Sequence, residues 1–303
     1  MQVEGECFPY YWAFIFFKCN FFVATVGYSD DASNPGVHYT MNRNPRGVAV
    51  IINNAEFQEN GAVKLSRRDG SKEDAMKMKI LFKWLQFKVV EHENCTAAEM
   101  RSHVRTLALD DHTNYDCCVL FLMSHGLETG VYGADGEVIT LEYITGKFSA
   151  KFSPTLANKP KLIFIQACRG KQPDKAVPVD VLECPLTDAN TFSPRKCYRP
   201  DDFVTTGTGV QSTVKIPNNA DMYIAFASSF THAALRNTAK GGWFVDKLYE
   251  VIINDDAHEN LTTMMTKVTN SVSQMKSDND EMQCPQQLTN LRKKLFFFPT
   301  HAL

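Results

Sequence analysis

Two kinds of apolar pattern alternate along the chain. Six runs rich in apolar and β-branched residues are typical of strands, at residues 46–57, 87–92, 116–126, 161–170, 221–229 and 293–299. Four other segments carry apolar residues at helical spacing, at residues 71–86, 96–109, 241–255 and 258–275. Continuous apolar strands are expected where a parallel sheet is covered on both faces. The pattern therefore predicts an α/β fold of three layers, with a mostly parallel six-stranded sheet between helices.

Two of the helical segments begin with the spacing of a capping box. Ser71 and Asp74 open the first of them, and Thr96 and Glu99 open the second. In this motif the first side chain accepts a backbone N–H three residues on, and the second side chain bonds back to the first backbone N–H. We expect both helices to start at these residues.

Two segments interrupt the regular pattern. Residues 1–37 contain an aromatic stretch behind an acidic start, "MQVEGE", which has the wrong charge for a signal peptide and only marginal length for a membrane span. We interpret them as an extension or prosegment, and expect no membrane attachment. The folded domain is predicted to cover residues 38–303. Within it, residues 171–214 show no sustained period, and a loop of that length is either functional or disordered and is open to cleavage.

Composition narrows the class of protein. The 303 residues are 44% apolar and 22% charged, with a formal net charge of -2. Nucleic acid and anionic membranes are not expected partners, since both favour a basic face. Nine cysteines without a CxxC pair suggest neither a disulfide framework nor a zinc site, so a reducing, cytoplasmic location without metal or organic cofactor is expected. Most of the thiols are interpreted as small core residues, namely Cys95, Cys117, Cys118 and Cys284.

Two chemically capable side chains follow predicted parallel strands. His125 comes after one strand and Cys168 after another, and the carboxyl ends of parallel strands share one edge of the sheet. If the strands are neighbours, the imidazole and the thiol can share a proton, and the backbone N–H groups of Gly126 and Cys168 can bind a developing oxyanion. Taken alone, each side chain has a simpler interpretation, a structural histidine and an inert packed thiol.

The motif around Cys168 carries a family resemblance. The string "QACRG" is intact, and His125 precedes Cys168 by 43 positions. Together with "RGVAVIINNAEF", "RRDGSKEDA", "MSHG", "IPNNADMYIAFAS" and "RNTAKGGWF", it makes the chain from about Tyr39 to residue 298 resemble the caspase family. The resemblance implies a cysteine endopeptidase of apoptosis that cuts proteins after aspartate.

The same resemblance assigns further residues. Arg68, Gln166 and Arg236 match the family's pocket for the substrate aspartate, with Arg67 as the alternative if the turn is displaced by one residue. Guanidinium groups suit this task because they offer both charge and directed donors to a carboxylate. Arg169 is interpreted as a structural brace. A caspase-like protease that cuts after Arg or Lys is disfavoured, because its pocket should carry carboxylates.

The sequence departs from the family around the second pocket arginine. Ala233 and Leu235 occupy positions where the family usually has aromatic residues that line neighbouring substrate pockets, and Gly242 replaces the usual serine. Less apolar surface is available to the substrate there, at a cost of roughly 25 cal/mol per Å². We therefore expect altered or weak selectivity beyond the aspartate.

Activation is expected to follow the family habit of linker cleavage. Candidate cleavage sites follow Asp180 and Asp188, and cleavage after Asp31 would release the N-terminal segment. The products would be a large-subunit part, about residues 38–180, and a small-subunit part, about 215–303, which pair and form a symmetric homodimer. We expect an insect-like, short-prosegment, effector-type member. The alternative is an inactive caspase-like decoy that binds an active caspase or an inhibitor-of-apoptosis-type protein.

Overall fold

A computed structural model describes residues 36–59, 61–177, 216–254 and 259–297. All of them belong to a single compact unit, Pro35–Leu303. Three candidate cleavage sites, at Asp31, Asp180 and Asp188, lie outside the described residues.

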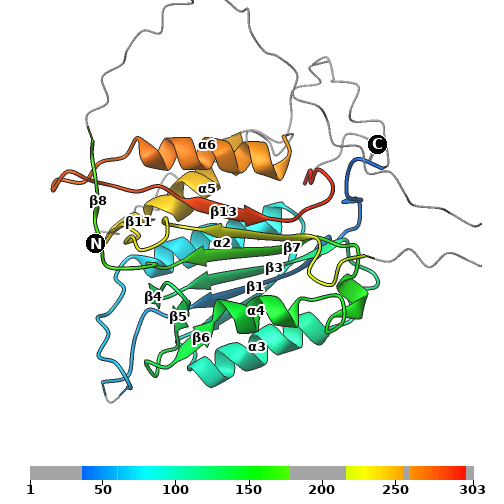
Figure 1. Ribbon diagram of the computed structural model, residues 1–303, viewed down its shortest axis with the longest axis horizontal. Coiled ribbons are helices and arrows are strands. Elements are labelled where there is room, and N and C mark those ends of the chain that lie inside the picture. Colours follow the sequence, from blue (N-terminus) through cyan, green and yellow to red (C-terminus); the bar gives the residue numbers. More distant parts are fainter. Residues whose placement is uncertain (1–35, 60, 178–215, 255–258, 298–303) are drawn as a thin grey trace, which may run out of the picture. The chain divides into compact units, whose positions relative to one another are not determined.

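A six-stranded sheet forms the middle layer of this unit (Figure 1). Its strands, in spatial order, are β13 (Gln286–Thr289), β9 (Met222–Phe226), β7 (Lys161–Gln166), β3 (Cys117–Met123), β1 (Gly47–Asn53) and β2 (Lys88–Glu93). All neighbouring pairs are parallel except β13 with β9. Every residue of β1, β3 and β7 is buried, as expected of strands covered on both faces. The predicted fold class is confirmed.

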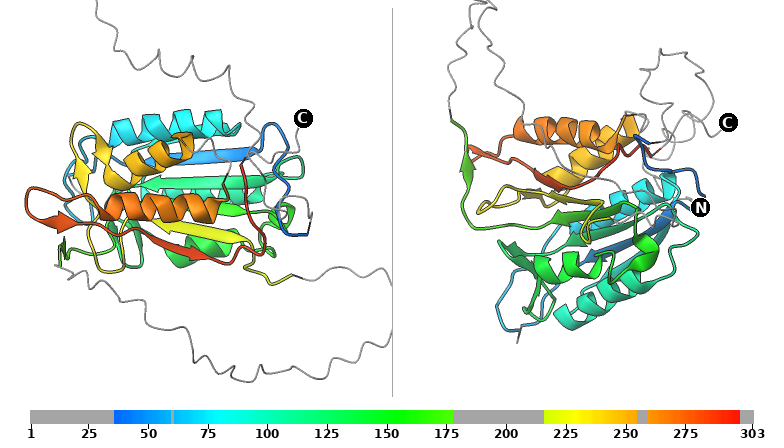
Figure 2. Two further views of the ribbon diagram at one scale, coloured as in Figure 1. Left: turned by 90° about the horizontal axis from the view of Figure 1, so that it is seen from above. Right: turned by 45° about the vertical axis from the view of Figure 1, so that its right-hand side comes forward.

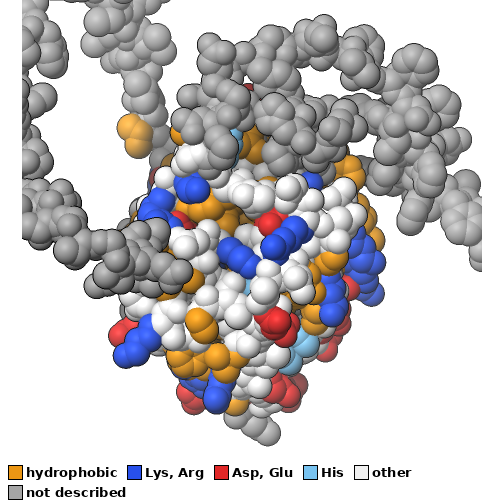
Figure 3. Space-filling model, turned by 90° about the vertical axis from the view of Figure 1, so that its right-hand side faces the viewer, with side chains coloured by type: hydrophobic (Ala, Val, Ile, Leu, Met, Phe, Trp, Pro, Cys, Tyr) orange, Lys and Arg blue, Asp and Glu red, His pale blue; other side chains and the backbone are white. Residues whose placement is uncertain are grey.

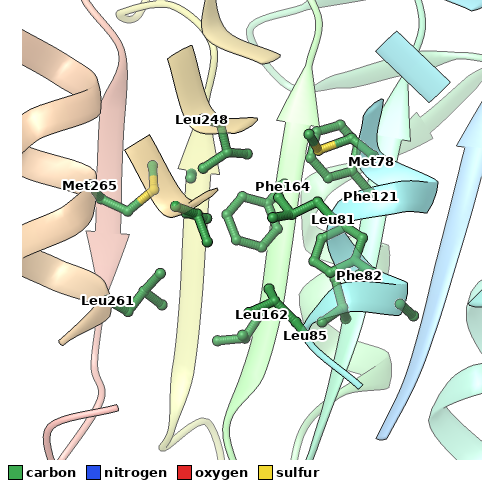
Figure 4. Close-up of a cluster of buried hydrophobic side chains, with 14 of the residues drawn as sticks. Met78, Leu81, Phe82, Leu85, Phe121, Leu162, Phe164, Leu248, Leu261 and Met265 are labelled. Atoms are coloured by element: carbon green, nitrogen blue, oxygen red, sulfur yellow. The ribbon is translucent and has the colours of Figure 1, made fainter. Parts of the chain in front are cut away.

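Helices cover both faces of the sheet. One face carries α2 (Ser71–Trp84), α5 (Trp243–Asn254) and α6 (Leu261–Ser273), and the other carries α3 (Ala97–Leu109) and α4 (Leu141–Lys147) (Figures 1 and 2). On the first face, Phe121 of β3 and Phe164 of β7 stack with ring centroids 5.6 Å apart beneath Phe82 of α2 (Figure 4). This packing buries the apolar face of α2 against the sheet, as expected of stacked layers.

Short strands and a 3₁₀ turn lie outside the six-stranded sheet. A small three-stranded sheet, β4 (Gly126–Leu127), β5 (Gly130–Tyr132) and β6 (Val138–Thr140), follows β3 directly. A 3₁₀ turn lies before β7 at Pro154–Leu156. Two further ribbons are β8 (Asp174–Lys175) with β12 (Glu281–Met282), and β10 (Arg236–Asn237) with β11 (Gly241–Gly242).

The predicted closing strand at residues 293–299 is wrong. The sixth strand is β13, "QQLT", which lies at an edge of the sheet and is half exposed, so that it has no apolar run to reveal it. Leu295 and Phe297 are apolar for another reason, because both pack into the core beside α2 and α6. Cys284 also differs from the prediction. It is exposed, whereas the other three thiols interpreted as core residues are buried.

One of the two predicted capping boxes is present. The Thr96 hydroxyl accepts the Glu99 N–H at 3.2 Å, and the Glu99 carboxylate accepts the Thr96 N–H at 2.8 Å. The other box is wrong, because α2 begins after Gly70, whose φ of 82° permits a turn without a side-chain cap. Asp74 instead accepts a hydrogen bond from a distant part of the chain.

We expect Thr96→Ala to lower the free energy of unfolding by about 1 kcal/mol, because the first turn of α3 loses its acceptor. Urea denaturation followed by circular dichroism measures this change. Thr106→Ala, at an exposed position in the same helix, is the matched control and should change stability by less than about 0.5 kcal/mol. Equal losses in both variants would contradict the role of the cap.

The end of the sheet at which the parallel strands begin is shown in Figure 3. Lys and Arg side chains on this face lie among acidic and apolar ones rather than forming a field of one sign. In the described part of the chain, no helix combines the length and the apolar character that a membrane crossing requires.

Candidate active site

Four neighbouring strands bring the predicted site residues to the carboxyl end of the sheet. His125 follows β3, and Cys168 follows β7. The loop after β1 leads to Arg68, and the loop after β9 leads to Arg236. These strands are adjacent in the order β9, β7, β3, β1, and they end on the left of Figure 1, where β4, β8 and β11 are labelled. Their carboxyl ends therefore form the candidate site.

The segments that carry His125 and Cys168 are in contact. The Ser124 N–H donates to the Gln166 carbonyl at 3.2 Å, which joins the two strand ends. A Cβ on Gly126 would lie only 2.6 Å from the Cys168 carbonyl oxygen. Position 126 must therefore be glycine for the two turns to approach this closely.

The hairpin β4–β5 directs the Gly126 amide outward. The Tyr132 N–H bonds the His125 carbonyl at 2.9 Å, and Gly126 faces Val131 one position further along the ladder. Hydrogen-bonded and non-hydrogen-bonded pairs alternate in an antiparallel ladder, so the Gly126 N–H points away from β5. An amide in that position can donate to a ligand beside Cys168.

The His125 imidazole is oriented by the backbone of a distant loop. Its Nε2 lies 2.8 Å from the Ser66 carbonyl oxygen, and its ring packs on Phe57 with centroids 5.0 Å apart. Because a carbonyl only accepts, Nε2 carries the proton of the neutral ring. Nδ1 is then the nitrogen that can accept a proton from another group. Neither Ser66 nor Phe57 was predicted.

Cys168 meets the loop that precedes Arg236. Its half-buried Sγ accepts the Ala234 N–H at 3.3 Å, and it lies 3.8 Å from the Ala234 carbonyl oxygen. Among the described residues, no hydrogen bond joins this thiol to His125. Such contacts often form only when substrate is bound. The Ala234 N–H thus lies directly beside the sulfur.

We expect His125 to titrate below the ordinary range of histidine. Burial lowers the pKa of its imidazole, as do the charges of Arg68 and Arg236, against the opposing Ser66 carbonyl. NMR titration of the ring in a Cys168→Ala protein should give a pKa below 6.5, and Arg236→Gln should raise that pKa by removing one positive charge. Arg67→Gln, at an exposed position, is the control. An unchanged pKa in the Arg236 variant would contradict this electrostatic link.

Arg68 is buried, with 2% of its surface exposed. Its guanidinium donates to the Asn54 carbonyl at 2.9 Å and to the Asn53 side chain at 3.3 Å, so the end of β1 orients it. Burial and the charge of Arg236 together lower the pKa of Arg68 to about 9, against the opposing charges of Asp74 and Cys168. Arg68 thus keeps its charge at neutral pH. The alternative, Arg67, is exposed and faces Glu56 and Asp69.

Arg236 and Gln166 complete this part of the site. Arg236 is half-buried, and its Nε donates to the Asp69 carbonyl at 2.8 Å, just beyond Arg68 in the chain. Burial lowers the pKa of Arg236, whereas the charges of Asp74 and Cys168 raise it. Gln166 is 2% exposed, and its Oε1 has no hydrogen-bond partner. The two guanidinium groups and the thiol therefore interact electrostatically, and Gln166 lies against Gly242, the register partner of Arg236.

A family model for the caspase domain matches residues 46–296 of the chain. The chain belongs to the caspase family. It is 32% identical over 244 residues to caspase-2 of Gallus gallus, with 78% of this chain and 53% of the relative covered. It is also 32% identical over 278 residues to cell death protein 3 of Caenorhabditis remanei, covering 86% and 52%.

The fold agrees with this assignment. The crystal structure of caspase-1 from Spodoptera frugiperda matches with a TM-score of 0.73 at 26% identity, covering 87% of this chain and 96% of that one. The chain spans about half the length of the two curated relatives given above. The family resemblance inferred from "QACRG" and the accompanying motifs is confirmed.

Ala233 and Leu235 lie on the caspase domain loop that reaches Cys168. Both are partly exposed, and backbone contacts hold them. The Ala233 N–H donates to the Gln172 carbonyl at 3.0 Å. The Leu235 N–H donates at 2.6 Å to Gln283, whose side chain is 1% exposed. Gln283 therefore supports this loop, and nothing in its sequence context had marked it.

Arg169, the residue after the cysteine, lies between two aromatic rings. Its guanidinium carbon is 4.0 Å from the centroid of Phe226 and 5.1 Å from that of Phe230. It also donates to Gln286 of the edge strand β13. These contacts tie the cysteine turn to β9 and β13, as a structural brace would.

Proposed function

We propose that this caspase-family chain is a cysteine endopeptidase that cleaves proteins after aspartate. The observation that carries the proposal is the meeting, at one sheet edge, of a histidine and a cysteine with two guanidinium groups that interact electrostatically with the cysteine. A nucleophile alone would fit any acyl transfer. The arginine pair adds a preference for a carboxylate beside the reacting bond.

The proposed reaction is acyl transfer to the cysteine followed by hydrolysis. The Cys168 thiol proton passes to His125, and the thiolate attacks the carbonyl carbon of the scissile peptide bond. The backbone N–H groups of Gly126 and Cys168 stabilise the resulting oxyanion. When the C–N bond breaks, His125 gives its proton to the leaving amine. Water then hydrolyses the thioester, with His125 accepting and returning a proton.

The proposed aspartate pocket lies between Arg68 and Arg236, with Gln166 at its side. A carboxylate that leaves water must find both charge and donors, and a buried guanidinium that loses its partner is costly. A library of peptides that differ only at the residue before the cleaved bond tests this. We expect hydrolysis after Asp, and at least tenfold less after Asn. If the linker-cleaved protein hydrolyses no peptide while a control caspase does, the proposal fails.

Activation by cleavage in the segment between β8 and β9 is part of the proposal. The candidate sites are after Asp180 and Asp188, with Asp31 as a site of N-terminal removal. A role in apoptosis is supported by the relative named cell death protein 3. A cytoplasmic location is supported by the free thiols of all five described cysteines, which suit a reducing compartment.

We also propose a homodimer formed through β13. This strand leaves one edge of the sheet unpaired, and Leu288 on it is 48% exposed. Beside it is a hollow of about 320 Å³ lined partly by Met222 and Ile224. Leu288→Glu should make the linker-cleaved protein sediment as a monomer, and the equally exposed Leu109→Glu should not. A dimer that survives Leu288→Glu would exclude this interface.

A decoy that binds an active caspase or an inhibitor-of-apoptosis-type protein is the second candidate. Two observations favour it. The sulfur of Cys168 is engaged by Ala234 rather than by His125, and the neighbouring wall consists of Ala233 and Leu235. For a decoy, Cys168→Ala should keep the whole cellular effect of the wild type. Loss of that effect in the variant excludes this candidate.

A further inference from the structure

The site contains a buried carboxylate that the proposed reaction does not use. Asp74 lies in the first turn of α2 and is 0% exposed. Its Oδ1 accepts the Gly242 N–H at 2.8 Å, and its Oδ2 has no hydrogen-bond partner. A buried ionisable group with an unpartnered oxygen is costly in a purely structural role.

The β10–β11 ribbon is shaped around this carboxylate. A Cβ on Gly241 would lie 2.1 Å from Asp74 Oδ1, and Gly241 has a φ of 90°, so this position suits only glycine. Gly242, whose amide binds Asp74, is the register partner of Arg236. Asp74 therefore holds the β10–β11 ribbon against α2. This ribbon carries Arg236, the second arginine of the proposed pocket.

Three cations face Asp74. Arg68, Arg236 and Lys77 interact with it electrostatically, and Lys77 also contacts Asp246 of α5 at 2.7 Å. Burial outweighs the opposing Gly242 N–H and these cations, so that the pKa of Asp74 is raised to about 6. Beyond the two arginines lie the other titratable groups of the site, His125, Cys168 and Asp69.

Two guanidinium groups face one buried carboxylate in the free protein. Lys77 is matched by Asp246, and Asp69, which interacts with Arg236, is matched by Arg67 at 3.2 Å. A substrate aspartate between Arg68 and Arg236 brings a second carboxylate close to Asp74. The two carboxylates then compete for the same pair of cations.

We propose that Asp74 is a specificity-determining residue of the aspartate pocket, which shares the two arginines with a substrate carboxylate and takes up a proton when that carboxylate enters. The inference rests on the proposed function. It follows from thermodynamic linkage. A carboxylate that binds near Asp74 favours the protonated form of Asp74, so protonation of Asp74 must raise the affinity for that carboxylate by the same factor. Affinity for an aspartate peptide should therefore fall as the pH rises.

Calorimetry tests proton uptake directly. The Cys168→Ala protein, cleaved in its linker by added wild-type protein, is titrated with a capped peptide ending in Asp-amide, and with its Asn counterpart, in buffers of different ionisation enthalpy between pH 5.5 and 7.5. We expect the Asp peptide to bind with a net uptake of up to about one proton. As the pH rises, its affinity should fall by up to about tenfold for each unit by which binding raises the pKa of Asp74. The Asn peptide should show neither effect.

Two variants assign the proton. Asp74→Asn should abolish the extra uptake and flatten the pH dependence, whereas Glu73→Gln, an exposed neighbour on the same helix turn, should change neither. Equal uptake with and without Asp74 overturns the inference while leaving the proposed function intact. Failure of the parent protein to bind the Asp peptide overturns both. If Asp74→Asn does not fold, a pH-independent affinity in the parent protein still overturns the inference.

Discussion

Replacing Cys168 by alanine is expected to abolish peptide hydrolysis and self-cleavage together. Among the described cysteines no other is expected to replace it, because only Cys168 and Cys284 are not buried, and Cys284 lies just before the edge strand β13 rather than at the end of a parallel strand. The loss in kcat should be on the order of 10⁴-fold or more, since the nucleophile and its proton acceptor act as one unit. The Ala234 N–H would lose only a weak acceptor, so the fold should persist.

Mass spectrometry of the purified protein beside the variant measures this effect. Wild type should yield fragments whose ends identify the cut aspartates, whereas the variant should remain one chain of 303 residues. Cys284→Ala is the matched control and should be processed like wild type. Identical fragments from wild type and Cys168→Ala would mean that another protease makes the cuts, and residual hydrolysis by the variant would remove Cys168 from the reaction.

The chain pattern reveals the site residues that follow strands. His125 and Cys168 follow continuous apolar runs, so the rule that parallel strands end on one side predicts both residues at the same end of the sheet. That their strands are neighbours is shown by the pairing of β3 with β7. The Thr96 capping box is equally local, because its two members are three residues apart. In both cases the signal and the structure it predicts lie within one short segment.

Contacts between distant segments left no such signal. Asp74 has the spacing of a capping residue, yet its carboxylate binds Gly242, far along the chain. The Ser66 carbonyl that orients His125 is a backbone atom, which any residue type could supply. The edge strand β13 is polar because one side of it is exposed. Pairing partners of this kind depend on the assembled sheet, and a periodicity analysis considers one segment at a time.

The first pocket arginine was assigned by motif, and the structure distinguishes it from the arginine next to it in the chain. Arg67 and Arg68 are adjacent and chemically identical, so the motif that assigned Arg68 left Arg67 as the alternative for a turn displaced by one residue. Their surroundings are opposite, because Arg67 points to solvent beside Glu56 while Arg68 is held by the end of β1. Substituting each arginine in turn therefore gives a matched comparison that tests the proposed specificity.

Arg68→Gln should lower kcat/KM for an aspartate peptide by about 10² to 10³-fold, because truncating one partner of a desolvated charge pair costs 2–5 kcal/mol. The loss should appear mainly in KM, and the preference for Asp over Asn should shrink with it. Arg67→Gln, whose side chain is 70% exposed, should stay within about twofold of wild type, as surface ion pairs contribute little.

Steady-state kinetics on the two peptides separates recognition from folding. Because Arg68 also bonds Asn53 and Asn54, its loss can destabilise the end of β1, so Arg236→Lys serves as a second variant. That change keeps the charge and removes the planar fork, and should give a smaller loss with the same shift toward KM. Equal kinetics for the Arg67 and Arg68 variants would contradict the assignment. The two arginines are adjacent in the chain, but only Arg68 is buried beside the ends of the parallel strands.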